Sequence, residues 1–468
     1  MPRSSATGPL TLAVPAPNAA QVEQRLLAES PLESGCFCLV REIRRGDGVR
    51  LVLDGTVDGS ESWTAQGERR LTPSGLRISA AVSAAQTAGS GLAFLHTHPM
   101  LDGVPTLSAI DKETTERLGR VVRDLIDGPF ISLVISADGC WAGVTATERG
   151  LEPLSISVAG RHLRTWPAHG ARVPVSHNPL DDRQTQALGV SGQRVLQDLV
   201  VAVIGAGGLG SPVAETLVRM GVGEVVLVDD DVLDTPSNLR RIFGASSEAL
   251  KRQRPPHKSE LIAEYLNGLG IGSLVTPIVG DIREPSTQGK VLRCHLLING
   301  TDTHSSRAAV TELAVRAALP AIDIGVRVGA RLSGQLDALL FERRVLIPEG
   351  PCLWCWQRLD AERIRLELMP AEQRSQLIHE GYVTGFDDGP APSVAALTVT
   401  AAGSACAALL ALISGAFDVA PLAVSVDAVS MEMVPFDRDE PDPNCICQRW
   451  RLAHTPSPKG GTTSGTAV

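Results

Sequence analysis

Two histidines and an aspartate lie close together in the first quarter of the chain, in a pattern that can hold a metal ion. His96 and His98 follow the apolar run 91–95, which is typical of a buried strand. Residues two apart on a strand face the same side, so both imidazoles can point at one metal. Ser108 and Asp111 open a segment with helical periodicity, and the carboxylate of Asp111 would come from its first turn. Three protein ligands with a water in the fourth position are the arrangement of a catalytic zinc.

This segment resembles the signature of the JAB/JAMM (MPN-plus) zinc metallopeptidases, which is His-x-His-Pro, a spacer and Ser-x-x-Asp. Here the spacer between Pro99 and Ser108 is longer than in the usual pattern. The resemblance covers residues 20–150 and implies a protease that removes ubiquitin-like proteins or trims their C-terminal tails. It also implies that Ser108 steadies the oxyanion and that an upstream glutamate is the general base.

Glu33 is the first candidate for that base, because residues 31–40 resemble the family's glutamate where it enters the first core strand. Glu29 and Glu42 are alternatives, and each could instead be a solvated surface residue. A lone His-x-His pair is often part of an ordinary strand, so the expectation of zinc rests on the combined pattern.

A glycine-rich loop follows a second buried strand near residue 200. The run 199–204 is continuously apolar, which is typical of a parallel strand buried on both faces. The loop contains four glycines: Gly205, Gly207, Gly208 and Gly210. They allow a tight turn and a close approach of the backbone to phosphate at the positive end of a helix. Asp229 ends the next strand, where a ribose-binding carboxylate is expected. These features alone also fit an NAD-dependent oxidoreductase.

Polar residues further along favour a triphosphate over a nicotinamide cofactor. Asp231, Asn238 and Arg241 follow the acidic strand end, and Lys258 begins another helix. Asp302 ends a further strand. Acids at strand ends with arginine and lysine nearby can hold magnesium and a triphosphate.

The order of these motifs over residues 180–452 resembles the ThiF/MoeB/ubiquitin-activating adenylyltransferases. The resemblance implies that the four glycines line ATP and that Asp229 binds its ribose, with Asp231 close by. It further implies that Asn238, Arg241 and Lys258 hold the phosphates and that Asp302 binds magnesium. Arg183 lies in a segment that looks like the family's entry helix, and it would reach the phosphates of the partner subunit. A homodimer is therefore expected.

Four of the nine cysteines form two short pairs: Cys352 with Cys355, and Cys445 with Cys447. Four thiolates without an open position make a structural zinc site. The second pair is Cys-x-Cys where the family has Cys-x-x-Cys, and the alternative is buried free thiols packed against tryptophans. Residues 381–392, where the resemblance places a thioester cysteine, contain none. A thioester step is therefore not supported, and Cys406 is left as a weak candidate.

Length and composition limit the remaining possibilities. With 468 residues, two or more domains are expected. The net charge of −9 gives no electrostatic footprint for nucleic acid, and the odd, partly clustered cysteines favour a reducing cytoplasm. The uncharged segment 393–417 is long enough to span a membrane, but it is rich in small residues and lacks basic flanks. We expect it to be a buried helix, with no membrane partner.

We expect an α/β protein with two independent parts. An N-terminal JAB/MPN α/β domain over residues 20–150 would precede a Rossmann-like ThiF-type adenylation domain over residues 180–453. The sequence also predicts a flexible N-terminus over residues 1–19, a linker over residues 151–179 and a disordered tail over residues 454–468.

The expected function is that of a bifunctional protein in a bacterial ubiquitin-like pathway. A zinc peptidase would process a ubiquitin-like protein, and an ATP- and magnesium-dependent activator would adenylate its C-terminal glycine, with a conjugating enzyme as a further partner. One alternative is an activator of a sulfur carrier in cofactor or metabolite biosynthesis. Another is a scaffold with an inactive peptidase site.

Overall fold

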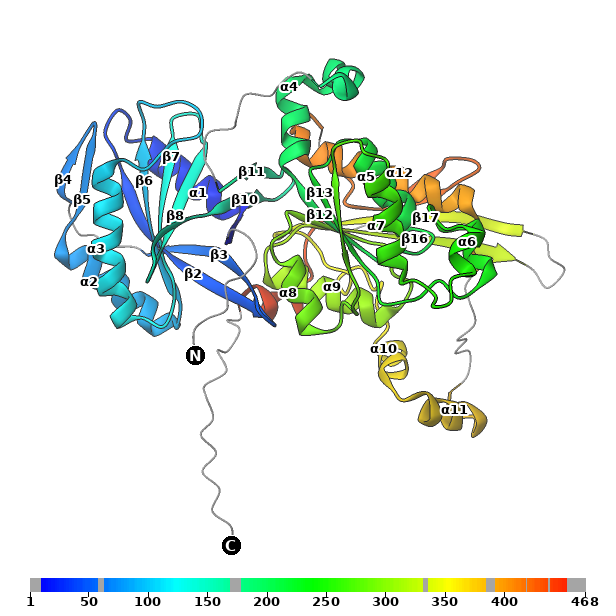
Figure 1. Cartoon of the computed structure of the whole chain (residues 1–468). Coiled ribbons are helices and arrows are strands. Elements are labelled where there is room, and N and C mark those ends of the chain that lie inside the picture. Colours follow the sequence, from blue (N-terminus) through cyan, green and yellow to red (C-terminus); the bar gives the residue numbers. More distant parts are fainter. Residues whose placement is uncertain are drawn as a thin grey trace, which may run out of the picture.

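Two large β-sheets and the helices that cover them make up the structure, which is a computed structural model (Figure 1). It describes residues 10–57, 63–168, 178–330, 336–383, 392–417, 419–436 and 438–452. The tail predicted over residues 454–468 lies outside these ranges.

The first sheet has nine strands in the order β11-β10-β1-β3-β2-β6-β7-β8-β9. The bounds are β1 (Thr11–Pro15), β2 (Gly35–Arg45), β3 (Gly48–Val57), β6 (Gly91–His98), β7 (Phe130–Ser136), β8 (Trp141–Thr147), β9 (Gly150–Pro153), β10 (Ser155–Ala159) and β11 (Arg164–Trp166). A separate hairpin pairs β4 (Trp63–Gly67) with β5 (Arg70–Pro73). Three helices accompany this sheet: α1 (Ala16–Leu27), α2 (Gly75–Ala88) and α3 (Ala109–Leu125).

The alternation of side chains along these strands separates two apolar faces. Leu95 of β6 packs in the cluster that includes α1, whereas its neighbour Phe94 packs with α2 and α3 on the opposite face. Val52 of β3 lies in a third cluster, whose other members come mostly from the C-terminal half. Thus α2 and α3 cover only part of the second face, and the C-terminal half of the chain covers the rest.

The ends of this sheet correct two predictions about the chain. Residues 11–15 form β1, which is buried and lies between β3 and β10, so they are not a flexible terminus. Residues 150–166 supply β9, β10 and β11, so they are not a linker. Prolines and glycines interrupt these segments, so their strands are too short to show a clear periodicity. The strands are completed by distant partners: Thr11 pairs with Ser155, far away in sequence. Only residues 169–177 of the predicted linker lie outside the described ranges.

The C-terminal half contains an eight-stranded sheet in the order β14-β13-β12-β15-β16-β17-β18-β19. Its strands are β12 (Val200–Ile204), β13 (Glu224–Val228), β14 (Leu274–Ile278), β15 (Leu296–Asn299), β16 (Ala321–Ala330), β17 (Leu336–Leu346), β18 (Ala423–Asp427) and β19 (Met433–Pro435). The longer helices are α4 (Asp182–Asp198), α5 (Gly210–Arg219), α7 (Lys258–Gly268), α9 (His304–Arg316) and α12 (Ala395–Ser414). The shorter ones are η1 (Pro179–Asp181), η2 (Pro236–Arg240), α6 (Ser247–Leu250), α8 (Pro285–Val291), α10 (Ala361–Leu368), α11 (Ala371–His379) and α13 (Cys447–Leu452).

The direction in which successive strands are added to the sheet reverses between β12 and β15, and the chain segments that follow these two strands diverge there. From β12 the chain moves outward through α5, β13, α7 and β14, and then returns through α8 to place β15 on the other side of β12. These strands are parallel, and right-handed crossovers put α5 and α7 on one face and α8 and α9 on the other (Figure 1). Ligands of such sheets bind where the strand order reverses, outside the carboxyl ends of the strands.

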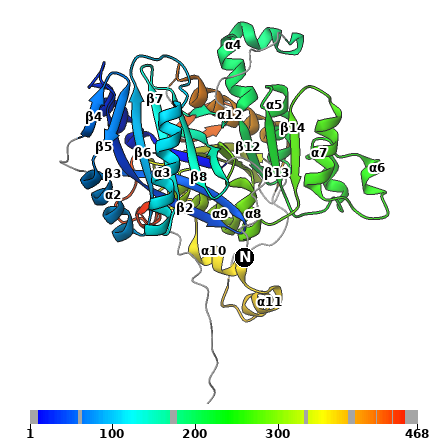
Figure 2. The ribbon, with the colours of Figure 1, turned by 60° about the vertical axis from the view of Figure 1, so that its left-hand side comes forward.

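Three helices outside this framework stand apart from it. Helices α10 and α11 project from the body of the molecule in both views (Figures 1 and 2). Helix α4 is bent at Gly189, whose φ of 70° and ψ of 167° are not helical, and its first part also projects. The predicted entry helix is therefore present, with a sharp kink at a glycine.

Helix α12 is the uncharged segment. It is the single helix within the described ranges that is long and apolar enough to cross a membrane, with a mean hydropathy of 2.0 over its most apolar stretch, half of which is buried. Ala401, Ala405 and Leu409 repeat at helical spacing and are buried, and the helix packs against α5, β16 and β17. The prediction of a buried core helix agrees with this packing.

The two halves share one apolar core, so the expectation that they are independent is wrong. Ala13, Ile43, Val52 and Ala159 of the first sheet belong to the same buried cluster as the strands of the second. The amide of Leu163 also donates to the carbonyl of Leu412 over 2.8 Å. The sequence predicts two separate cores, because periodicity does not show that part of one face of the first sheet packs against the C-terminal half.

Arg50 lies at the centre of this interface and is completely buried. Its guanidinium donates to the carbonyls of Leu292, Cys294 and Ala317 and to the hydroxyl of Ser157, over 2.8 to 3.1 Å. The carbonyls lie at or just beyond the C-terminal ends of α8 and α9, where helix dipoles favour a cation. Burial lowers the pKa of Arg50 to about 10, so the side chain is still charged at neutral pH.

Arg50→Ala should lower the free energy of unfolding by roughly 3 kcal/mol, because it leaves three buried carbonyls without their donor. Urea denaturation followed by tryptophan fluorescence measures this change. The matched control is Arg149→Ala, an exposed arginine in the same half, which should change stability by less than about 0.5 kcal/mol. Equal stability of the two variants would show that Arg50 does not hold the interface.

Candidate functional site

The structure brings together the three residues of the predicted zinc site. Nε2 of His96 lies 3.4 Å from one carboxylate oxygen of Asp111, and Nε2 of His98 lies 3.4 Å from the other. One potential ligand atom from each residue lies within 4.8 Å of those of the other two. Strand β6 supplies both histidines on one face, and the first turn of α3 supplies the aspartate. These are the elements that the sequence predicts.

Helix α3 begins with a reciprocal cap that orients Asp111. The hydroxyl of Ser108 accepts the amide of Asp111 over 3.2 Å, and the amide of Ser108 donates to the Asp111 carboxylate over 2.7 Å. Burial alone would raise the pKa of Asp111, but the imidazoles of His96 and His98 and the bond to Ser108 hold it well below its ordinary value. Ser108 thus fixes the carboxylate, whatever further role it has.

Glu33 is the glutamate at this site. Its Oε1 lies 4.0 Å from Nε2 of His98, and the residue is buried. Its amide donates to the carbonyl of Gly67 in the β4–β5 hairpin over 2.9 Å. Burial raises the pKa of Glu33, while His96 and His98 lower it. The alternatives lie elsewhere: Glu29 is exposed and accepts a bond from Gln66, and Glu42 pairs with Arg44.

The long spacer after Pro99 is bound to the turn between β7 and β8. The amide of Ala137 donates to the carbonyl of Leu101 over 2.8 Å, and Asp138 accepts the amide of Gly103 over 3.0 Å. Leu107, near the end of the spacer, is buried. The extra residues are therefore accommodated at the side of the site, and they do not separate His98 from Asp111.

The donor set at this site fits a zinc ion. Both ring nitrogens of His96 and Nδ1 of His98 are buried without a hydrogen-bond partner among the described residues. Such atoms cost free energy, and a metal at the two Nε2 atoms would remove part of that cost. Two imidazoles and one carboxylate, with room for a water, are ligands that catalytic zinc takes.

The glycine-rich loop lies at the carboxyl end of β12, beside the divergence from β15. Gly205 has a φ of 90°, and its amide donates to the carbonyl of Val228 over 2.8 Å. A Cβ on Gly210 would lie 1.6 Å from the carbonyl oxygen of Gly205, so only glycine fits there. Gly207 and Gly208 complete the turn, and the N-terminus of α5 follows directly. This is the geometry of a phosphate-binding loop.

Asp229 and Lys258 lie beside this loop. Asp229 accepts the amide of Ala206 over 2.6 Å and that of Asp231 over 2.9 Å, and burial raises its pKa to about 6. Nζ of Lys258, which is buried at the start of α7, donates to Asp231 over 2.6 Å. The acidic strand end and the lysine, which are distant in sequence, therefore share one edge of the sheet.

The remaining predicted residues differ in how closely they approach this loop. Asn238 is buried, and its side-chain oxygen accepts two bonds from Arg241, whose side chain packs against Gly208. Asp302 is exposed and lies three residues beyond β15. Arg183 is exposed in the first turn of the projecting part of α4. The family resemblance predicts that it reaches the phosphates bound by a partner subunit.

The four paired cysteines come together in a third cluster. The sulfur atoms of Cys352 and Cys355, of Cys352 and Cys445, and of Cys355 and Cys447 are each 3.7 Å apart. A disulfide would require about 2.05 Å. Tetrahedral zinc with bonds of about 2.3 Å places its sulfurs about 3.8 Å apart. The Cys-x-Cys spacing of the second pair therefore allows a tetrathiolate site, and thiol hydrogen bonds already lower the pKa of Cys355.

Cys406 lies inside α12 and is buried, and burial raises its pKa to about 12. A thiol in this state is a poor nucleophile, because the thiolate is the reactive form.

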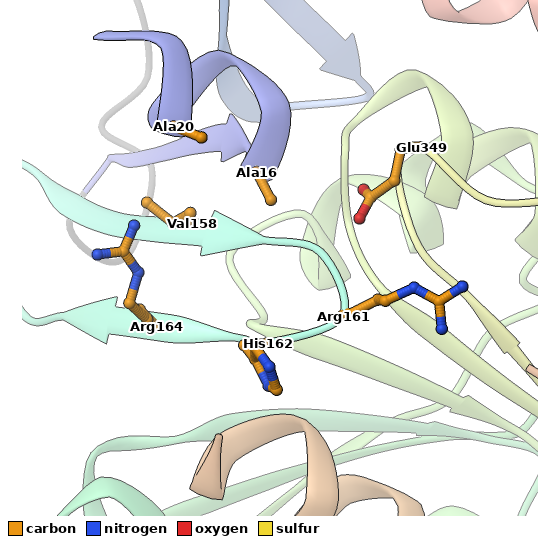
Figure 3. Close-up of a pocket in the computed structure, with 7 residues that line it drawn as sticks. All are labelled: Ala16, Ala20, Val158, Arg161, His162, Arg164 and Glu349. Carbon is orange, nitrogen blue, oxygen red and sulfur yellow. The ribbon is translucent and has the colours of Figure 1, made fainter. Parts of the chain in front are cut away.

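A separate cavity of about 290 Å³ lies where the two halves meet (Figure 3). It is lined by Ala16, Ala20, Val158, Arg161, His162, Arg164 and Glu349. Arg164 is engaged with Glu23 over 2.8 Å, and none of the predicted site residues lines the cavity. We assign it no role.

The family model described as "ThiF family" matches residues 181–447, which are more than half of the chain. The chain belongs to the ThiF family. This result confirms the predicted Rossmann-like ThiF-type fold of the C-terminal half. The match does not extend to the N-terminal half, for which the sequence predicts a JAB/MPN domain.

Curated relatives share parts of this ThiF-family chain. The adenylyltransferase and sulfurtransferase UBA4 of Yarrowia lipolytica is 30% identical over 168 residues, which are 36% of this chain and 38% of that protein. The SAMP-activating enzyme E1 of Haloferax volcanii is 26% identical over 168 residues, 36% of this chain and 57% of that protein. Both alignments leave much of each protein unmatched.

A third relative and a solved structure also resemble part of this chain. The sulfur carrier protein ThiS adenylyltransferase of Bacillus subtilis is 30% identical over 168 residues, 36% of this chain and 46% of that protein. The crystal structure of E. coli MccB with MccA-N7isoASN is 20% identical, with a TM-score of 0.45, and covers 58% of this chain and 75% of that chain.

One buried acid near the nucleotide edge, Asp323, belongs to none of the predicted motifs. Asp323 lies in β16, is 2% exposed and pairs with Arg307 of α9. An acid inside the apolar run 321–324 is the signal that could have found it.

We expect about two zinc ions per chain, one at the histidine site and one at the cysteine site. His96→Ala and Cys352→Ser should each remove one ion, and Cys352→Ser should also lower thermal stability, because structural zinc contributes to folding. Elemental analysis with a melting curve measures both effects. Cys140→Ser, a half-buried cysteine outside the cluster, should keep both ions. An unchanged zinc content in Cys352→Ser would mean that these thiols are only core residues.

Proposed function

We propose that this chain transfers adenylate from ATP to the C-terminal glycine of a ubiquitin-like or sulfur-carrier protein. Membership of the ThiF family over residues 181–447 carries the proposal. The arrangement of the glycine loop, Asp229 and Lys258 at one edge of the sheet supports ATP as the donor. The names of two relatives, which refer to SAMP and to ThiS, support the class of acceptor.

In the proposed reaction a carboxylate oxygen of the carrier attacks the α-phosphorus of ATP. The bond from that phosphorus to the bridging oxygen breaks, and pyrophosphate leaves with the electron pair. Arg241 and Lys258 lower the barrier by neutralising charge that grows on the leaving group. Asn238 orients Arg241 through its two hydrogen bonds, and Asp231 holds Lys258 at the sheet edge. The amides at the start of α5 bind the phosphates.

Asp302 fits a magnesium ion through its donor type and its position. It is an exposed carboxylate on the loop after β15, the strand that diverges from β12. Magnesium takes one or two carboxylates together with phosphate oxygens, and when bound it would neutralise phosphate charge. In the same proposal Arg183, on the projecting part of α4, reaches the nucleotide of a second subunit, so the active form is a homodimer.

Asp302→Asn should reduce ATP–pyrophosphate exchange by about 100-fold or more, because the variant loses the carboxylate that holds magnesium. The assay uses purified chain with small carrier proteins that end in glycine. Asp439→Asn, an exposed aspartate of the same half, is the matched control and should exchange normally.

Exchange at the wild-type rate in Asp302→Asn would remove the assignment of that residue. Tight binding of NAD without any exchange would favour the oxidoreductase alternative over adenylation.

A second activity is proposed for the N-terminal half: zinc-dependent hydrolysis of a peptide or isopeptide bond at the C-terminus of the same carrier. The observation that favours it is the convergence of His96, His98, Asp111 and Glu33 on one point. A zinc ion held there would activate a water and polarise the scissile carbonyl.

In this proposal Glu33 takes a proton from the attacking water. Its backbone bond to the β4–β5 hairpin and its distance of 4.0 Å from His98 support this role. Ser108 is proposed to steady the oxyanion while it caps α3. The longer spacer is bound to the β7–β8 turn and leaves the three ligands together, which argues against the inactive-scaffold alternative.

The two proposed activities suit one sequence of events. Hydrolysis produces the free C-terminal carboxylate that adenylation consumes. In the step after adenylation, a sulfur nucleophile or a thiol of a conjugating enzyme attacks the acyl carbon, and AMP leaves with the oxygen of the broken acyl–phosphate bond. The burial of Cys406 favours a route that does not use this thiol. The sulfur-carrier alternative therefore fits the chain as well as a conjugation pathway does.

Glu33→Gln should slow cleavage of a carrier bearing a C-terminal extension by about 100-fold or more, because the amide cannot accept the proton. Zinc content, by elemental analysis, should stay at the wild-type value, because Glu33 is not a ligand. Glu29→Gln and Glu42→Gln are matched controls and should cleave normally. If Glu33→Gln cleaves normally and one of the two controls loses cleavage, the glutamate replaced in that control is the general base.

A further inference from the structure

The loop that carries Asp302, residues 300–303 and called here the Asp302 loop, is held at both ends. The amide of Gly300 donates to the carbonyl of Ile204 over 2.9 Å, which joins the loop to β12. The hydroxyl of Thr303 accepts the amide of Ser306 over 3.3 Å and so caps α9. Between these anchors Asp302 is exposed.

A third anchor lies beneath the loop. The hydroxyl of Thr301 donates to the side-chain oxygen of Asn299 over 3.0 Å, and the side-chain amide nitrogen of Asn299 donates to the carboxylate of Asp323 over 2.8 Å. Asn299 and Asp323 are register partners on β15 and β16, so their side chains point to the same face of the sheet. Thr301 also packs beside Gly205, where an added Cβ would lie 3.3 Å from its methyl group.

Arg307 completes the chain of contacts. One nitrogen of its guanidinium donates to both oxygens of Asp323 over 2.5 and 2.7 Å, and the other donates to the carbonyl of Ile324 over 3.1 Å. Both side chains are 2 to 3% exposed. Arg307 belongs to the first turns of α9, the helix that Thr303 caps. The network therefore connects the start of α9, the middle of β16 and the Asp302 loop.

A buried ion pair is a costly way to stabilise a fold. The loss of hydration can exceed the attraction, and apolar side chains of similar volume often give equal or greater stability. What a buried ion pair can add is a fixed position for the side chains that bond to it. Here Asp323 accepts bonds from both Arg307 and Asn299, so its position sets the position of Asn299 and, through it, of Thr301.

We propose that Asp323 and Arg307 are positioning residues that hold the Asp302 loop against the glycine loop, so that Asp302 meets the magnesium ion of bound ATP. This inference rests on the proposed adenylation. The role differs from that of Asp302, because neither residue of the buried pair is exposed to a ligand. It predicts that the network changes metal affinity while leaving the binding of the nucleotide itself intact.

The test measures metal binding, so it needs no cognate carrier. Mn²⁺ takes the same oxygen ligands as Mg²⁺ and gives a paramagnetic resonance signal. Its affinity for the purified full-length chain is titrated in the presence of α,β-methylene-ATP, and the affinity of the nucleotide alone is measured without metal. The variants are Thr301→Val, Asp323→Asn and Asp302→Asn. Thr398→Val is the matched control, because its hydroxyl donates to a carbonyl within α12 over 3.0 Å.

Thr301→Val and Asp323→Asn should each weaken Mn²⁺ binding about five- to tenfold. The first loses the hydrogen bond to Asn299, and the second loses the charge and one of the two oxygens that hold Arg307. Metal-free nucleotide affinity should stay within about twofold of wild type. Thr398→Val should match wild type in both measurements. Asp302→Asn should weaken Mn²⁺ binding more than either network variant.

A double variant, Arg307→Met with Asp323→Leu, separates positioning from stability. An apolar pair of this kind can keep thermal stability close to wild type, but it cannot hold Asn299. We expect it to melt near wild type and to bind Mn²⁺ as weakly as Asp323→Asn. Wild-type Mn²⁺ affinity in a stable double variant would show that the pair serves the fold alone.

The outcomes distinguish this inference from the proposed function. If wild type does not bind the nucleotide, or if Asp302→Asn binds Mn²⁺ normally, the adenylation site itself is wrongly assigned. If wild type and Asp302→Asn behave as expected but Thr301→Val equals wild type, the positioning role is overturned while the proposed function stands.

Discussion

The arrangement of this chain depends on one buried cation, Arg50, which has no carboxylate partner among the described residues. Arg50 is held by carbonyls at the C-terminal ends of α8 and α9, where backbone dipoles supply the opposing charge. Helix α9 begins at the loop that carries Asp302 and ends near Arg50. A single helix therefore spans the distance between the sheet interface and the candidate magnesium ligand. The N-terminal sheet therefore packs against α8 and α9, and α9 begins at the nucleotide edge.

The two candidate reaction sites are built by different means. The histidine site uses local geometry: alternation along β6 directs two imidazoles to one side, and a capped helix delivers the carboxylate. The nucleotide edge uses topology, because the loops after β12 and β15 meet only through the reversal of strand order. Close packing of Gly205 and Gly210 then leaves the backbone near the ligand position. The first site would tolerate changes in distant strands better than the second.

The residues that make up the candidate sites could be predicted because their sequence motifs are local. The spacing of His96, His98 and Asp111, the glycine loop and the cysteine pairs each lie in short segments whose secondary structure follows from periodicity. The role of residues 150–166 could not be found in this way, since β10 joins the rest of the sheet through β1, at the other end of the N-terminal half. Asp323 was missed for a similar reason: its partner Arg307 comes from another element. Contacts across an interface, such as those of Arg50, leave no periodic pattern in the sequence and cannot be predicted from it.

The position of β1 has a consequence for how the protein is made on the ribosome. Strand β1 is synthesised before β3 and long before β10, yet it pairs with both of them. The face around Val52 stays open longer still, because the carbonyl of Ala317 that meets Arg50 must first leave the exit tunnel. A nascent chain that has finished the histidine site thus still exposes an unpaired strand edge and an apolar surface. The N-terminal half would need protection, by a chaperone or by rapid elongation, until the ThiF-type sheet has emerged.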